Sequence, residues 1–473
     1  MVWTIARREL VDIAREGRLR WAAGLIAMLL LVSLTSGWTH RRSIQMDHES
    51  AERLARAQWL TQPARDPHSA AHYGAYAFKP QDPLTLFDPG VNAYTGVAAF
   101  LEAHKQNEFQ FRAAQDGTSV VRFGELTAAA TLQLLIPVLI IFMAFTRFAG
   151  EREEGTLRQV IASGVPRQTL AVGKVAGISV VLAIVLVPAA VAGAAAIILA
   201  DAGAGFGPLG VRTAVLSLVY VAYFLTILMI SLAVSAAVAG SSQALALLIA
   251  FWVLNTIVAP RVASDVSTRL YPTPSAFEFA EDVERDTYDG LSVHAYNLRR
   301  APDLRERLLR EYRVARVQDL PVNFRGIDYL EREAHANQVW DEHYGRLWWL
   351  FERQVRTHRM AGVAAPLLAL RSVSMGLSGS DFFHHRHFAM AAESYRRQLV
   401  GAMNYDLAFS ATSKQLGYTA GPGLWQRLAP FEYQPPTVTS AIAQQAWSLM
   451  SLAAWLLIGG FSLLYAVHSL QVE

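Results

Sequence analysis

Six long, uncharged, apolar runs constrain what this chain can fold into more than any other feature. Each run is close to or above the roughly 20 residues that a helix needs to cross a bilayer. Backbone amides inside hydrocarbon find no water to bond, so each spanning run must be helical. We predict six transmembrane helices over residues 21–38, 126–145, 175–199, 213–239, 243–260 and 441–467.

The composition agrees with a membrane protein. The chain has 473 residues, of which 53% are hydrophobic and 17% charged, against roughly 25% charged in a typical soluble domain. Pro137 and Pro188 fall inside two of the runs, and the carbonyls that a proline frees in lipid need neighbouring helices as partners. We therefore predict an all-α polytopic membrane protein whose spans form a bundle.

The distribution of basic residues predicts the orientation of the spans. Arginines crowd the first 20 residues, and Arg147, Arg152, Arg158, Arg167 and Lys174 lie in the short segment 147–174. Short basic segments stay in the cytoplasm, whereas long segments cross largely regardless of charge. We therefore place 1–20, 147–174 and the tail 468–473 in the cytoplasm. The long segments 39–124 and 261–440 are expected outside, and residues 125–260 hold the second to fifth spans.

The first 20 residues have the pattern of an amphipathic helix. Trp3, Ala6, Leu10 and Ile13 recur on one face, while arginines occupy much of the other, which is typical of a helix lying in the membrane interface. A cleaved signal peptide is the competing interpretation of the first apolar run. We favour a retained span, because signal peptides rarely have so long a structured leader.

A dense polar motif separates the second and third apolar runs. In Gly150 to Leu157 (GEREEGTL), two glycines bracket four charges and Thr156 can cap a helix. Leu157, Val160 and Ile161 then recur at helical spacing. The pattern predicts a short amphipathic helix between two spans, and an ordinary solvated loop is the alternative.

This motif resembles the cytoplasmic coupling segment of ABC-2 type exporter permeases, in which Glu-Arg/Lys-Glu is followed by Gly-Thr-Leu, then Arg and a closing Lys. The resemblance implies a permease subunit that forms a pathway with a second copy or a related permease, in a bacterial inner (plasma) membrane. A separate cytoplasmic ABC ATPase would bind ATP and magnesium and dock on this segment. The residues that the resemblance assigns to coupling are Glu151, Arg152, Glu153, Gly155, Thr156, Leu157, Arg158, Arg167 and Lys174.

The two segments expected outside differ from the short loops of the plainest ABC-2 permeases. Residues 261–440 carry more than half of the charged residues of the chain and show helical stripes. Residues 39–124 begin with a similar stripe and then become rich in proline. We predict one mostly helical extracytoplasmic domain built from both. The stretch from Gly379 to Arg396 is similar to a branch of the family with a large insertion between the fifth and sixth spans.

A histidine cluster in that stretch is a candidate metal site. Imidazole and carboxylate groups suit zinc or copper, and Asp381, His384, His385 and His387 lie close together in the sequence. On a helix, His384 and His387 share a face while His385 points away. The candidate ligands are therefore Asp381, His384 and His387, and helix capping with ordinary hydrogen bonds is the competing interpretation.

Several other chemistries lack their sequence motifs. No phosphate-binding loop with a Gly-Lys-Ser/Thr ending is present, so ATP would be bound by a partner and no cofactor is expected in this chain. Neither a His-Glu-x-x-His nor a Gly-x-Ser-x-Gly motif occurs. There are no cysteines, and the net charge is only +3 with no basic stripe, so a nucleic-acid partner is not expected. Few polar residues, chiefly Gln133, Gln243 and Asn255, fall inside the spans, which favours ATP-driven over ion-driven transport.

A second hypothesis keeps the ATPase but not the transport. In it, the extracytoplasmic domain is a lever that transmits ATPase motion to an extracytoplasmic protein. The exporter hypothesis predicts ATPase activity that depends on a substrate, and the lever hypothesis predicts stimulation by the extracytoplasmic partner. The sequence does not identify the substrate.

Overall fold

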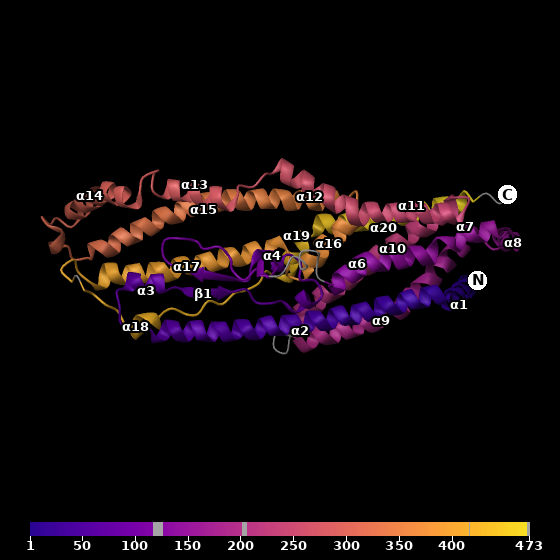
Figure 1. The fold of residues 1–473 in the computed structure, drawn as a ribbon, viewed down its shortest axis with the longest axis horizontal. Coiled ribbons are helices and arrows are strands. Elements are labelled where there is room, and N and C mark those ends of the chain that lie inside the picture. Colours follow the sequence, from indigo (N-terminus) through magenta and orange to yellow (C-terminus); the bar gives the residue numbers. More distant parts are fainter. Residues whose placement is uncertain (117–125, 201–205, 416, 471–473) are drawn as a thin grey trace.

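The computed structural model describes residues 1–116, 126–200, 206–415 and 417–470. The molecule is elongated and almost entirely helical (Figure 1). Both termini lie at one end, together with helices α7 (Thr146–Glu153) and α8 (Thr156–Ala162). We call this region the terminal end, and we call the opposite part of the molecule, which contains α14 (Val293–Glu311), the head.

Six helices in the described part of the chain are long and apolar enough to cross a membrane, which confirms the predicted fold class. Helix α10 lies at the centre of this bundle and packs against α20 and α6. Its inward residues Tyr223, Leu228 and Leu232 belong to the main hydrophobic core. The principal helices of the six spans are α2 (Gly17–Thr61), α6 (Ala128–Ala144), α9 (Arg167–Ala200), α10 (Phe206–Ala237), α11 (Ser241–Val253) and α20 (Ala446–His468).

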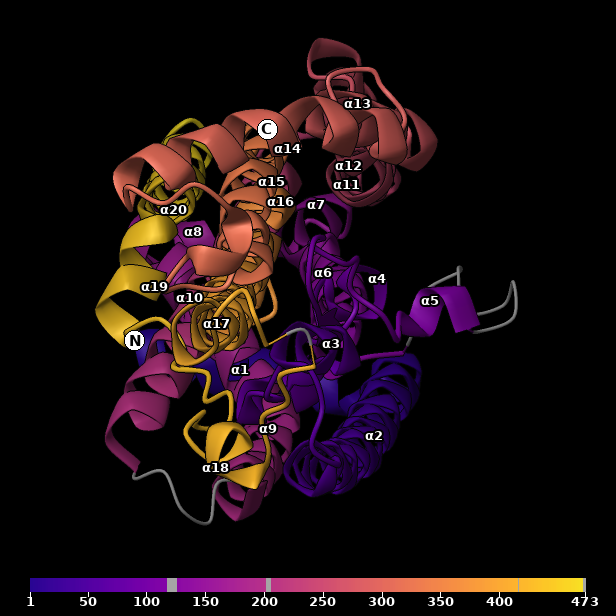
Figure 2. The same ribbon diagram turned by 90° about the vertical axis from the view of Figure 1, so that its left-hand side faces the viewer.

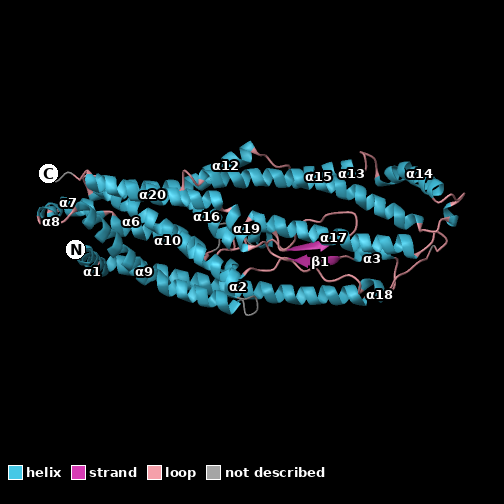
Figure 3. Cartoon of the chain, turned by 180° about the vertical axis from the view of Figure 1, so that it is seen from behind, coloured by secondary structure: helices cyan, strands magenta, loops and turns pink. Residues whose placement is uncertain are grey.

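Two spans, the first and the fifth, extend furthest beyond their predicted apolar runs. Helix α2 continues for 45 residues, roughly 67 Å at 1.5 Å per residue, and so runs from the bundle into the head (Figure 3). Its sequence has no proline until Pro63. Helix α11 likewise continues through a π-helical turn, η3 (Leu254–Val258), into α12 (Ala259–Leu270). Pro260 does not end this helix, since proline is tolerated in a first turn.

The N-terminal helix α1 (Val2–Arg15) packs against α9. It ends at Arg15, and α2 begins at Gly17, so the N-terminal helix is shorter than the predicted range 1–20. A side chain at Gly173 of α9 would lie 2.6 Å from Ile5, and one at Gly177 would lie 2.6 Å from the Cβ of Glu9. These glycines therefore allow α1 to approach α9 closely, and the amphipathic helix that we predicted is docked on the bundle.

The last span begins later than expected because of one buried polar residue. Gln445 separates α19 (Val438–Gln444) from α20. Its amide accepts a hydrogen bond from the Ser372 hydroxyl at 2.7 Å and donates one to Asp381 at 3.0 Å. The predicted span 441–467 thus contains a helix break that is held by residues from the head.

In the head, the two long segments pack against each other. The indole of Trp59, near the end of α2, donates to the carbonyl of Trp425 at 3.0 Å, and helix α17 packs on α3. Seen from its end in Figure 2, the head groups its helices around α17. Its other elements are α3 (Pro67–Tyr73), η1 (Pro83–Leu86), α4 (Asn92–Thr95), α5 (Ala113–Asp116), α13 (Ala276–Thr287), η4 (Val317–Asp319), α15 (Phe324–Ala361), α17 (Phe382–Ser410) and α18 (Pro422–Trp425).

A small antiparallel sheet inside the head was not expected from the sequence. Strands β1 (Ala75–Phe78) and β2 (Ala98–Leu101) pair with Ala75 opposite Leu101 and Phe78 opposite Ala98 (Figure 3). Four-residue strands are too short to show clear alternation of apolar and polar residues. They are stabilised by packing, since Ala77 and Leu101 share a core with Phe388 of α17.

A short apolar helix joins the head to the bundle. Helix α16 (Pro366–Leu377) packs against α10 and α20, and Leu367, Leu370 and Val373 are fully buried in the main core. Its 12 residues are too few to cross a bilayer, so this helix is not among the six predicted spans. The head therefore shares its core with the spans.

Candidate functional site

The motif between the second and third spans folds as two short helices at the terminal end. Helix α6 ends at Phe145 and α7 begins one residue later. The hydroxyl of Ser235, on α10, accepts from the amides of Phe148 and Ala149, each at 3.1 Å, and donates to the carbonyl of Phe145 at 2.7 Å. This one side chain satisfies the backbone groups at the junction and attaches α7 to the central helix.

Two glycines with left-handed backbone set the direction of α8. Gly155 has φ of 72° and Gly164 has φ of 84°, conformations that cost little only for glycine. Gly155 is the N-cap of α8. Thr156, which we expected to act as the cap, instead donates from its hydroxyl to the carbonyl of Glu151 at 3.2 Å. It therefore stabilises the end of α7, because the left-handed glycine already occupies the capping position.

Glu151 and Lys174 point into the protein. The amine of Lys174 has no exposed surface and lies 2.8 Å from Glu151 and 2.7 Å from Glu9 of α1. Arg147 adds an ion pair with Glu16 at 2.8 Å. Buried charges are tolerated when they are paired in this way. The network connects α7, α9 and α1 into one unit.

Arg152 and Glu153 hold the turn between α10 and α11. Arg152 donates to the carbonyls of Ala236, at 2.7 Å, and Val238, which lie at the end of α10. Glu153 accepts from the amide and hydroxyl of Ser241, at 2.8 and 2.7 Å, at the start of α11. A cation at a helix C-terminus and an anion at an N-terminus both complement the helix dipoles, so α7 is attached to both helices.

The remaining motif residues divide by exposure. Leu157 is only 2% exposed and anchors α8 in the main core. Arg158 and Gln159 are exposed. Arg167, at the start of α9, donates to the carbonyl of His468 at 2.8 Å and so holds the end of α20. The structure thus brings the predicted coupling residues together at one end, where Lys174 is buried, Glu151 and Arg152 are half-buried, and Glu153 and Arg158 are exposed.

The partners of these residues were not predicted from the sequence, although the position of Glu9 could have indicated one of them. Glu9 lies on the otherwise apolar, buried face of α1 together with Ala6 and Ile13. A carboxylate in that position needs a buried cation. Ser235 and Ser241 have no comparable local signal, since their partners are about 90 residues away in the chain.

The histidine cluster of the head forms helix caps and hydrogen bonds. Asp381 is the N-cap of α17 and accepts from the amide of His384 at 3.1 Å, with the His384 Nδ1 at 2.6 Å. His387 instead pairs its Nδ1 with the Tyr433 hydroxyl at 3.0 Å. Within the described residues, Asp381, His384 and His387 do not converge as a three-ligand group, and capping, the competing interpretation, is confirmed.

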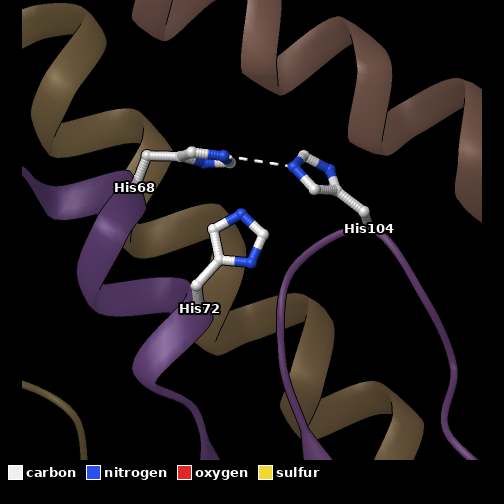
Figure 4. A group of neighbouring side chains, drawn as sticks. All are labelled: His68, His72 and His104. Carbon is white, nitrogen blue, oxygen red and sulfur yellow. Dashed lines mark hydrogen bonds between the residues drawn. The ribbon is translucent and has the colours of Figure 1, made fainter. Parts of the chain in front are cut away.

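A different histidine group does converge in the head. His68, His72 and His104 offer ring nitrogens that all lie within 4.8 Å of one another (Figure 4). This group was not predicted from the sequence. The available signal was the spacing of His68 and His72, which places two imidazoles on one face of a helix.

Comparison with protein families assigns the two parts of the chain separately. A family model described as ABC-2 family transporter protein matches residues 3–279, which is more than half of the chain. A second model, described as a domain of unknown function (DUF3526), matches residues 276–434 and so covers most of the head. No curated protein matches the chain.

Proposed function

Because this chain belongs to the ABC-2 family of transporter proteins, in which it is a membrane permease component, we propose that it forms the translocation pathway of an ABC exporter. It would act with a second copy of itself or a related permease, and a separate ABC ATPase would supply the energy. The observation that carries the proposal is the α7–α8 pair. An exposed helix there is connected to α1, α9, α10 and α11 through a buried ion-pair network around Lys174 and through hydrogen bonds of Arg152 and Glu153.

The two faces of the α7–α8 pair suit different tasks. The exposed residues Glu154, Arg158 and Gln159 are available to an ATPase. The residues that contact the bundle, Glu151, Arg152 and the exposed Glu153, would carry its movement to α9, α10 and α11. Salt bridges and hydrogen bonds with two alternative arrangements are suited to such switching, because packed interfaces move between discrete states.

The proposed location follows from the distribution of basic residues along the chain. The terminal end carries the short basic segments and would lie in the cytoplasm of a bacterial inner membrane. The head would then be extracytoplasmic. This orientation puts the exposed surface of α8 where an ATPase and its ATP are found.

Native purification with mass spectrometry tests the partner. We expect an ABC ATPase to co-purify with the wild-type chain from source membranes. Arg158→Glu reverses the charge of an exposed side chain, so it should remove the ATPase while leaving the fold intact. Glu153→Lys should retain the ATPase but uncouple its activity from transport, since it breaks the contact with Ser241.

The matched control is Arg305→Glu, the same exchange at an exposed position in the head. It should retain the ATPase fully. Absence of any ABC ATPase from the wild-type preparation would overturn the proposal. Loss of the ATPase in the control would show that charge reversal, rather than the α8 surface, is responsible.

One observation favours a lever as a second candidate. Helix α2 runs without interruption from the bundle into the head for 45 residues, and α16 of the head is buried between spans. Movement of the spans would therefore displace the head. In this case a purified extracytoplasmic protein, rather than a small substrate, would stimulate the ATPase. Cross-linking in intact cells, followed by an ATPase assay with the captured partner, separates the two candidates.

A further inference from the structure

Three histidines in the head are arranged like the ligands of one ion. His68 and His72 lie one turn apart on α3, and His104 lies on the loop that follows β2 (Figure 4). The centroids of the three rings form a nearly equilateral triangle with sides of 4.9, 4.9 and 5.0 Å. Side chains from two separate elements thus converge on one point.

The orientation of two rings is set by oxygen acceptors behind them. Nδ1 of His104 lies 2.7 Å from a carboxylate oxygen of Glu333, on α15. Nδ1 of His68 lies 2.9 Å from the amide oxygen of Asn404, on α17. Both contacts place the proton on Nδ1 and leave the Nε2 lone pair free, which is how outer-shell partners prepare metal-binding histidines.

The two Nε2 atoms face each other at 3.1 Å. Two lone pairs at that distance repel unless a proton or a cation lies between them. Two nitrogen ligands of a tetrahedral zinc ion, each about 2.0–2.1 Å from the metal, are about 3.3 Å apart. The observed spacing is therefore close to that of a coordinated pair.

The surroundings hold the arrangement and leave it open to solvent at His72. The second carboxylate oxygen of Glu333 lies 3.3 Å from Arg396, which is itself 1% exposed. The ring of Tyr329 stacks on His68 with centroids 3.6 Å apart and covers that side. His72 is exposed, so an ion can reach the group from solvent.

The charges around the group favour a cation. Glu333 and Glu102 supply nearby negative charge, with Lys105 as the opposing cation.

We propose that His68, His72 and His104 bind one divalent transition-metal ion of the zinc class. Three imidazoles leave a fourth position for solvent or a passing ligand. The ligands belong to the segment after α2, whereas Glu333 and Asn404 belong to the second long segment. The site therefore lies at the contact between the two segments of the head.

Zinc titration of the full-length protein tests the site. The chain is purified in detergent through an affinity tag without histidine, stripped with a chelator and titrated with zinc chloride by calorimetry. Elemental analysis of the same sample should give one zinc per chain. His72→Ala should abolish this binding, and because His72 is exposed, the fold should be retained.

Two further variants make the result specific. Glu333→Gln should weaken zinc binding about 10–100-fold, because the carboxylate orients His104. His343→Ala removes another histidine of the head, one that pairs with Asp286, and should retain one zinc per chain. A wild-type chain that binds neither zinc nor copper(II), or a His72→Ala variant that binds as tightly as the wild type, would overturn the proposal. Copper(II) in place of zinc, lost in the same variants, would support the site and identify its metal.

Discussion

At the scale of single residues, the terminal end depends on charges that are buried and shared. The Lys174 side chain has no exposed surface and forms ion pairs with both Glu9 and Glu151. Removal of the lysine amine would destabilise the protein mainly because it leaves buried carboxylates unpaired, which is costly.

Lys174→Met should therefore destabilise the protein by about 3–5 kcal/mol. A lower apparent unfolding temperature in detergent, with reduced yield, is the measurement. The triple variant Lys174→Met, Glu9→Gln, Glu151→Gln removes all three charges and should recover most of the loss. If the triple variant is no more stable than the single one, lost packing rather than unpaired charge is the cause.

His385 of the head should make stability depend on pH. Burial, with Lys79 and Arg112 nearby, lowers its pKa to about 3, below the value near 6.5 of an unfolded chain. The folded protein then binds fewer protons, so stability is lost as the pH falls from about 6.5 toward 3, by roughly 1 kcal/mol per pH unit.

The measurement is thermal unfolding at pH 7 and pH 5, followed by the intrinsic fluorescence of the 11 tryptophans, which include Trp348 beside His385. His385→Phe keeps an aromatic ring but cannot titrate, so the drop between the two pH values should shrink. An unchanged drop would assign the acid sensitivity to other groups.

At the scale of elements, the helices of the head are held by close backbone approach. A Cβ on Gly326, in the first turn of α15, would lie 2.4 Å from the backbone of Ala408 on α17. Backbone atoms cannot move aside as a flexible side chain can. Only glycine at this position allows α15 and α17 to meet.

Gly326→Ala should cost about 1–3 kcal/mol through overpacking. Gly345→Ala in the same helix is the matched control, because nothing lies within 4 Å of that Cβ position. It should stabilise the protein by roughly 0.5–1 kcal/mol, since alanine is the better helix former. Thermal unfolding of the two variants side by side should show shifts of opposite sign, and equal shifts would contradict the packing argument.

At the scale of the whole molecule, the orientation in the membrane can be tested because the chain has no cysteine. Gln159→Cys places a thiol on α8, and Glu306→Cys places one in the head; both positions are exposed. A membrane-impermeant maleimide should label Glu306→Cys in cells with a permeabilised outer membrane. It should label Gln159→Cys only after the inner membrane is opened. The reverse pattern would invert the proposed topology.

The sequence by itself determined the six apolar helices and the family resemblance. Apolar runs without charge must become helices in lipid, and the order of Glu151 to Leu157 between two of them was enough to indicate a permease. These inferences rest on local pattern and composition, and the six apolar helices and the family model agree with them.

Only the tertiary structure decided which side chains meet. Lys174 faces Glu9 across 165 positions and Glu333 faces His104 across 229, and no local pattern encodes such partners. The burial of α16 among the spans and the pairing of β1 with β2 were settled in the same way. The physical reason is that a buried charge or backbone group needs a polar partner, and this partner can come from a distant part of the chain. Which group lies close enough is determined only when the chain folds.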